Sequence, residues 1–329
     1  MEIRGFTPFD GQHCETTATG TLLGQLGIHY SEPMLFGLGE GLGFIFWKMK
    51  SMAFPFIGGR IKPDALTANI ARNLGLKLIV KETASKASAW NNVKEWVDRG
   101  RAVGLKLDSY YLEYFSTPIH FAGHYVAMYG YDAKSAFLVD TRQQGGKVKT
   151  SLESLAAARA AKGPMASKNL SYILEPARTA PDLKQAVREA IRGNAAEYLN
   201  PPIANIGYKG IAKTAAEIPK WFRSSGNVEE EFTATALLME KAGTGGALFR
   251  NLYRDFLGES GALLRSEPIL AAHADFETIA AMWTAIAGLL DKAGRTGNIR
   301  HVEAAADALR DVSGLEKRAM ERLAVSVRS

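Results

Sequence analysis

The sequence has one cysteine in 329 residues, too few for an intramolecular disulfide or for a zinc site built on two thiolates. It also has no apolar run of about 18 residues, because the most apolar stretch, 34–47, contains Glu40 and four glycines. The first ten residues lack the basic start and continuous apolar core of a signal peptide. These absences predict a soluble, cytoplasmic chain that does not bind a membrane, with Cys14 reduced.

Runs of lysine and arginine interleaved with aromatic residues are missing as well, which argues against nucleic-acid binding. The net charge of +6 is uneven: residues 1–175 hold 20 basic against 15 acidic side chains, and residues 176–329 hold 20 against 19. An acidic small ligand or an acidic protein partner fits this imbalance. With 47% apolar residues the chain is not disordered, and it is long enough for one large domain or two ordinary ones.

The first half alternates helix and strand signals. A helix is expected to open at Cys14 and to end at Gly27, while the glycine-rich segment 31–47 is too irregular for a helix and predicts a loop followed by a strand. Further helices are expected after Pro63 and over 88–100. β-rich runs separated by turn residues predict strands at 76–80, 102–108, 124–131, 135–140 and 169–175. The pattern indicates an α+β domain with an antiparallel sheet.

Strand signals end after the stretch Pro176–Pro181, and the remainder is rich in Ala, Leu, Glu and Arg with helical periodicity. This change predicts an N-terminal domain over 1–178 and an all-α domain over 179–329 that covers the site. Helices are expected at 182–193, 227–242, 246–257, 273–292 and 301–312.

Cys14, His124 and Asp140 are the candidate catalytic residues. A thiol with an ordinary pKa of about 8.5 becomes a nucleophile where a helix N-terminus and a neighbouring imidazolium stabilise its thiolate. His124 begins one expected strand and Asp140 ends the next, so a hairpin brings both to its open end. Their side chains share a face only when the loop is odd in length or the hairpin carries a bulge. In that register Asp140 orients His124, and His124 faces the thiol.

Three segments of the sequence resemble the butirosin biosynthesis protein H family: GQHCETTATGTLLGQLGIHYSEPMLFGLGEGLGF, GHYVAMYGYD with FLVD, and AGTGGALFRNLYRDFLGES. The resemblance covers nearly the whole chain and implies a papain-like, cysteine-protease-type domain followed by a helical domain. It implies an acyltransferase that moves an acyl group from the phosphopantetheine thioester of an acidic acyl carrier protein to a small amine, an aminoglycoside in the founding member. Cys14 would be the nucleophile, His124 the base and Asp140 the orienting residue. No cofactor is expected beyond the phosphopantetheine arm of the donor substrate.

The sequence departs from papain-like peptidases at the oxyanion hole, because Pro8 stands where those enzymes place a glutamine six residues before the cysteine. The backbone N–H of Cys14 is the leading oxyanion donor, and the Gln12 side chain is a weaker candidate. His13 either bonds to the site or holds the turn. Candidate substrate-binding residues are Gly37, Gly39, Arg250 and Arg254.

Two other functions stay open. A papain-like hydrolase (peptidase, amidase or thioesterase) shares the acyl-enzyme, and a non-catalytic binding module would retain only the fold. The intact Cys, His and Asp set argues against the binding module. His120 and His124 are four residues apart, but their β-rich context does not form a helical metal pair, so no metal is expected.

Overall fold

The structure of the chain is a computed structural model that describes residues 1–49, 52, 54–117, 120–163, 165–176, 182–241 and 246–327. It divides into two compact units. Unit 1 consists of residues 1–35 and 66–181, and unit 2 of residues 36–65 and 182–329. The expected boundary between residues 178 and 179 lies outside the described residues. A single boundary along the chain does not separate the two units, because residues 36–65 belong to the helical unit 2.

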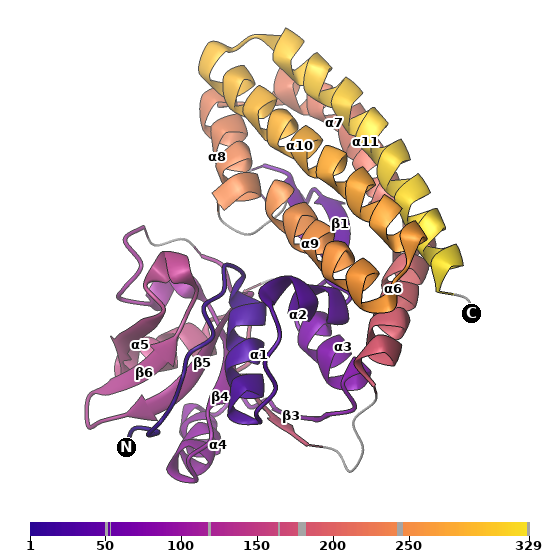
Figure 1. The fold of residues 1–329 in the computed structure, drawn as a ribbon. Coiled ribbons are helices and arrows are strands. Elements are labelled where there is room, and N and C mark those ends of the chain that lie inside the picture. Colours follow the sequence, from indigo (N-terminus) through magenta and orange to yellow (C-terminus); the bar gives the residue numbers. More distant parts are fainter. Residues whose placement is uncertain are drawn as a thin grey trace. The chain divides into compact units, whose positions relative to one another are not determined.

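Unit 1 contains a six-stranded sheet in the order β3-β8-β4-β5-β6-β7 (Figure 1). Each neighbouring pair in this order is antiparallel. The strands are β3 (Lys77–Lys81), β4 (Val103–Leu107), β5 (His124–Tyr131), β6 (Ser135–Val139), β7 (Lys147–Ser151) and β8 (Ser171–Glu175). The helices of this unit are α1 (Cys14–Gln25), α3 (Ala65–Asn73), α4 (Lys86–Asp98) and α5 (Leu152–Ala160), with short 3-10 helices η1 (Ser109–Tyr111) and η2 (Arg142–Gln144).

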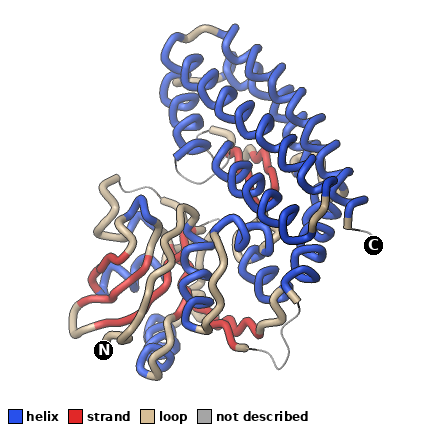
Figure 2. The backbone as a smooth tube through the Cα atoms, viewed as in Figure 1, coloured by secondary structure: helices blue, strands red, loops and turns tan. Residues whose placement is uncertain are grey.

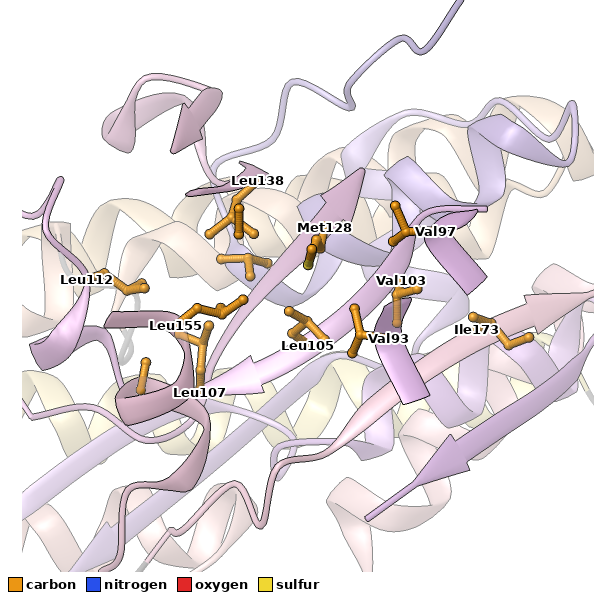
Figure 3. Packing of buried hydrophobic residues seen from close by; sticks show 13 residues of the cluster. Val93, Val97, Val103, Leu105, Leu107, Leu112, Met128, Leu138, Leu155 and Ile173 are labelled. Carbon is orange, nitrogen blue, oxygen red and sulfur yellow. The ribbon is translucent and has the colours of Figure 1, made fainter. Parts of the chain in front are cut away.

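The core of unit 1 lies between one face of this sheet and the helices α4 and α5 (Figure 3). Leu105 of β4 pairs with Val126 of β5, so alternate residues of both strands point to the same face. The helices supply residues spaced three or four apart, which lie on one side of a helix. The buried cluster comprises Val93, Val97, Val103, Leu105, Leu107, Leu112, Val126, Met128, Ala136, Leu138, Leu155, Ala158 and Ile173.

Unit 2 is mainly helical, with one β-hairpin formed by β1 (Leu42–Trp47) and β2 (Phe56–Arg60), as the colouring of Figure 2 shows. The long helix α10 packs against α8, α9 and α11, and α11 also packs against α7. Its helices are α6 (Leu183–Leu199), α7 (Gly207–Ser224), α8 (Val228–Lys241), α9 (Ala247–Leu264), α10 (Glu267–Thr296) and α11 (Ile299–Ser326).

The expected α+β class is confirmed, and each predicted strand of the first half overlaps an observed one. The interpretation of 31–47 was wrong at its start, because residues 32–38 form helix α2 (Glu32–Leu38) before β1 begins. Pro33 is tolerated there because it stands in the first turn of the helix, where its missing N–H costs nothing. The strands β2 and β7 and the helices α5 and α7 were not expected from the sequence.

Close packing explains the glycines of this segment. A Cβ added at Gly37 would lie 2.1 Å from the ring of Phe256, and one at Gly43 would lie 2.7 Å from the backbone of Arg60. Contacts this short are sterically forbidden, so only glycine fits at these two positions. The glycines therefore bring the hairpin segment close to the helices of unit 2.

Candidate active site

Cys14 is the first residue of α1, and its side chain is buried. His13 precedes it as the N-cap with an extended backbone, which ends the loop from Asp10 and Gly11. Within the described part of the chain, the backbone N–H of Cys14 has no hydrogen-bond acceptor. A helix N-terminus favours negative charge, so the thiol sulfur and this N–H lie where an anion is stabilised.

A buried carboxylate holds the loop that leads into α1. Glu32 of α2 accepts hydrogen bonds from the backbone N–H of Gln12 at 2.9 Å and of His13 at 2.8 Å, and from Thr16 Oγ1 at 2.8 Å. The carbonyl of His13 in turn accepts from the backbone N–H of Thr17 at 2.9 Å. The direction of the chain at Cys14 is therefore set by Glu32, a residue 18 positions further along.

His124 and Asp140 meet at one end of the β5–β6 hairpin. His124 is the first residue of β5, and Asp140 directly follows β6. The register of the two strands shifts between Met128 and Gly130, so β5 contains one extra residue there. This bulge places both side chains on one face of the sheet, whereas an uninterrupted ladder would place them on opposite faces. His124 Nε2 lies 2.8 Å from Asp140 Oδ2.

Asp140 is fully buried, and its carboxylate has three hydrogen-bond partners among the described residues. Its Oδ1 accepts from the backbone N–H of Thr141 at 2.6 Å. Its Oδ2 accepts from the hydroxyl of Tyr114 at 2.8 Å, in addition to the contact with His124. These contacts fix the position of the carboxylate, which in turn holds the imidazole ring in one orientation.

His124 is also a hydrogen-bond partner of the Cys14 side chain. Because Asp140 occupies Nε2, the nitrogen left for Cys14 is Nδ1. Burial lowers the pKa of His124, but the charges of Asp140 and Cys14 and the hydrogen bonds to both outweigh it and raise the pKa to about 10. The ring of Phe115 packs edge-on against the imidazole, with 5.4 Å between the ring centroids. The raised pKa favours the imidazolium form of His124, which lies between a carboxylate and the Cys14 side chain.

Two residues of the site, Tyr114 and Glu32, carry no signal in the sequence that identifies them. Tyr114 is 26 residues from Asp140, and Glu32 is 19 residues from His13. Neither residue stands in a motif with a fixed spacing, so no local signal identifies it. The remaining signal is indirect, since a buried carboxylate and a helix start without a side-chain cap both require donors or acceptors from elsewhere.

Of the other residues around Cys14, Gln12 is exposed and His13 is buried. The backbone of His13 holds the turn through Glu32 and Thr17, and its ring Nδ1 lies 3.4 Å from Thr16 Oγ1. The exposed amide of Gln12 directly precedes this buried turn.

The four candidate substrate-binding residues all belong to unit 2. Gly37 packs against a phenylalanine ring, and Gly39 lies buried in the turn after α2. Arg250 is fully buried and bonds to Glu316, so its guanidinium is engaged within unit 2. A buried guanidinium needs a buried counter-charge, and here the chain supplies it. Arg254 is partly exposed and bonds to neighbours on its own helix.

Among the described residues, no three His, Cys, Asp or Glu side chains lie close enough together to hold a metal ion. The helices in the described ranges include none that combines the length and apolarity required to cross a bilayer.

Unit 1 thus defines a class of protein in which a cysteine at a helix start faces a buried histidine–carboxylate pair on an antiparallel sheet, with a helical unit in the same chain. Residues 13–141 match the family described as butirosin biosynthesis protein H, N-terminal. Residues 153–323, just over half of the chain, match a domain of unknown function, DUF4872. The chain belongs to the butirosin biosynthesis protein H-like family, whose name refers to the biosynthesis of an antibiotic. No curated protein matches it.

Proposed function

We propose that this protein is a cysteine-dependent acyltransferase of secondary metabolism. It takes an acyl group from a carrier-protein or pantetheine thioester onto Cys14 and transfers it to an amine. The observation that carries the proposal is the continuous chain of contacts from Asp140 through His124 to Cys14 at the start of α1. Membership of a family named for antibiotic biosynthesis supports an enzyme of this kind.

The first half-reaction forms the acyl-enzyme. The His124 imidazolium favours the thiolate of Cys14, which attacks the thioester carbonyl. The oxyanion that develops on the carbonyl oxygen is stabilised by the backbone N–H of Cys14, with Gln12 as a second candidate donor. The C–S bond to pantetheine breaks, and the leaving thiolate takes the proton from Nδ1 of His124.

The second half-reaction transfers the acyl group. The amine attacks the carbonyl carbon of the Cys14 thioester, and the now neutral His124 accepts the proton that the nitrogen loses. The bond from the carbonyl to Cys14 breaks, which releases the amide and restores the thiolate–imidazolium pair. Asp140 keeps the ring oriented through both steps and stabilises its charge. Water attacking in place of the amine would give the free acid.

The test is intact-mass analysis of the full chain after mixing with a panel of acyl-pantetheine thioesters. Cys14 is the sole cysteine, so thiol acylation has one place to occur. We expect a mass increase of one acyl group, absent in Cys14→Ala. His124→Ala should slow formation of the adduct by roughly 10²–10⁴-fold, the usual contribution of a general acid–base. Candidate amines are added next, and the ratio of amide to free acid is measured.

An amide product from the full chain supports transfer, whereas free acid with every amine tried assigns the protein to the hydrolases. An adduct that persists in Cys14→Ala overturns Cys14 as the nucleophile. Consumption of no thioester in the panel, with Cys14 unmodified throughout, overturns the acyl-enzyme mechanism.

A further inference from the structure

Tyr114 is the one described hydroxyl that bonds to the carboxylate behind His124. Its Oη donates to Asp140 Oδ2 at 2.8 Å, the same oxygen that lies 2.8 Å from His124 Nε2. Two donors on one oxygen share its negative charge. The strength of one hydrogen bond therefore affects the strength of the other.

The loop that carries Tyr114 is held at both of its ends. Asp108, which is buried at the end of β4, accepts from the backbone N–H of Tyr110 at 3.1 Å and of Phe121 at 2.9 Å. Asp108 Oδ2 also lies 2.9 Å from His120 Nδ1. These contacts close the loop between β4 and β5 at its base.

The residue next to Tyr114 adds a third attachment. Glu113 accepts from the backbone N–H of Ser151 at 2.8 Å and from its Oγ at 2.7 Å, which ties the loop to the end of β7. Such fixed side chains hold a hydroxyl at one point, as positioning groups in active sites require. These contacts therefore fix the backbone that carries Tyr114, and its phenol lies against Asp140.

We propose that Tyr114 is a positioning residue of this site: its hydroxyl holds Asp140 and takes part of the charge on Oδ2, which limits how tightly the carboxylate retains the proton of His124. The inference rests on the proposed function, because a proton held less tightly is more readily donated to the leaving thiolate of the donor. Tyr114 acts through Asp140 and not on the substrate.

The charged surroundings are consistent with this role. The titratable groups that act on His124 are Asp140, after β6, and Cys14, at the start of α1, while Phe115 on the Tyr114 loop contributes an apolar edge. Burial, followed by the charges of Asp140 and Cys14, raises the pKa of Tyr114 well above its usual value. The phenol therefore remains protonated and a donor throughout the range in which His124 titrates.

The experiment compares Tyr114→Phe with Tyr111→Phe in the full chain. Tyr111 lies on the same loop but is partly exposed, and its ring contacts Tyr110 and His120 instead of the Asp140 pair. The readout is the midpoint of the His124 imidazole titration, followed by nuclear magnetic resonance. Without the hydroxyl, Asp140 Oδ2 holds the proton of His124 more tightly, so we expect Tyr114→Phe to raise the midpoint by about half to one pH unit. This shift corresponds to part of the free energy of one hydrogen bond to a charged group. Tyr111→Phe should leave it unchanged.

The kinetic counterpart is the single-turnover rate of Cys14 acylation. We expect Tyr114→Phe to slow it on the order of three- to tenfold at pH 7, because a less acidic imidazolium donates its proton less readily. A midpoint that stays the same or falls in Tyr114→Phe overturns the proposal, even if the variant is less stable. The titration requires no acyl transfer, so this inference and the proposed function can fail separately.

A second measurement uses the unmodified chain and does not depend on the folding of a variant. Protons in short hydrogen bonds to a buried carboxylate give resolved low-field signals. Because both bonds end on Asp140 Oδ2, the signals of the Tyr114 hydroxyl and of His124 Nε2–H should shift with one common midpoint. A Tyr114 signal that does not respond to the titration of His124 overturns the shared-oxygen arrangement.

Discussion

The pair formed by Arg250 and Glu316 is expected to contribute to stability and not to substrate binding. Both side chains are fully buried in unit 2. Arg250 Nε donates to Oε1 and Nη2 to Oε2 of Glu316, each at 2.9 Å, and Nη1 donates to the carbonyl of Gly59 at 2.9 Å. Trp283 Nε1 also donates to Glu316 at 2.6 Å, and the Arg250 guanidinium lies over the Trp283 ring.

The perturbation is Arg250→Met, which keeps most of the side-chain volume and removes the charge. Glu316 would then be a buried carboxylate with its cation missing and with the hydroxyl of Tyr198 and the indole of Trp283 as remaining donors. Breaking one side of a buried ion pair costs about 3–5 kcal/mol, because the other charge stays uncompensated. The loss of the donor to Gly59 acts in the same direction.

The assay is urea unfolding followed by far-ultraviolet circular dichroism, which reports on the helices of unit 2. Arg254→Met is the matched control on the same helix: this side chain is about one-third exposed and bonds to Asp255 at 2.7 Å, so its removal should cost less than about 1 kcal/mol. The double variant Arg250→Met with Glu316→Leu should lose less than the two single variants added together, by up to about 3 kcal/mol. An unchanged unfolding midpoint in Arg250→Met, with a raised KM for substrate, would refute this reasoning and restore the ligand contact.

Two further predictions concern His124 and Gly37. The pKa of His124 is about 10 in the folded chain against 6.5 for a free histidine, so its stabilising contribution is complete below pH 6.5 and is lost as the pH rises through 10. Urea unfolding at several pH values should show the free energy of unfolding falling by about 1.4 kcal/mol per pH unit between pH 6.5 and pH 10. His124→Gln should remove that slope. An equal slope in both proteins would show that His124 is not the group responsible. Gly37→Ala should lower the thermal midpoint because its Cβ would overlap Phe256, whereas Gly288→Ala on α10, with no atom within 4 Å of the added Cβ, should raise stability by about 1 kcal/mol. Equal effects of the two alanines would show that the contact at Gly37 is not close.

The sequence by itself determined the local elements that carry the candidate site. Turn residues and the periodicity of apolar residues are short-range signals, and they place a helix start at Cys14, a strand start at His124 and a strand end next to Asp140. The ends of helices and strands depend on residues a few positions away, which is why these positions can be predicted. The change from an α+β half to a helical half can likewise be predicted from amino-acid composition and from the period of the apolar residues.

Only the tertiary structure decided how these elements meet. The bulge between Met128 and Gly130 determines whether His124 and Asp140 share a face, and a one-residue change of register is not encoded in period-two alternation. Whether residues 36–65 pack with the sheet or with the helices is decided by contacts such as that of Gly37 with Phe256, more than 200 residues away.

The same holds for the partners of buried charges. Glu32, Tyr114 and Glu316 are ordinary polar residues in the sequence, and each is important because a buried donor or charge from a distant segment needs it. The energy of leaving such a group unpaired depends on burial, and burial is a property of the packed chain. Local propensity therefore determined where the candidate residues lie along the chain, and tertiary packing determined which of them contact one another.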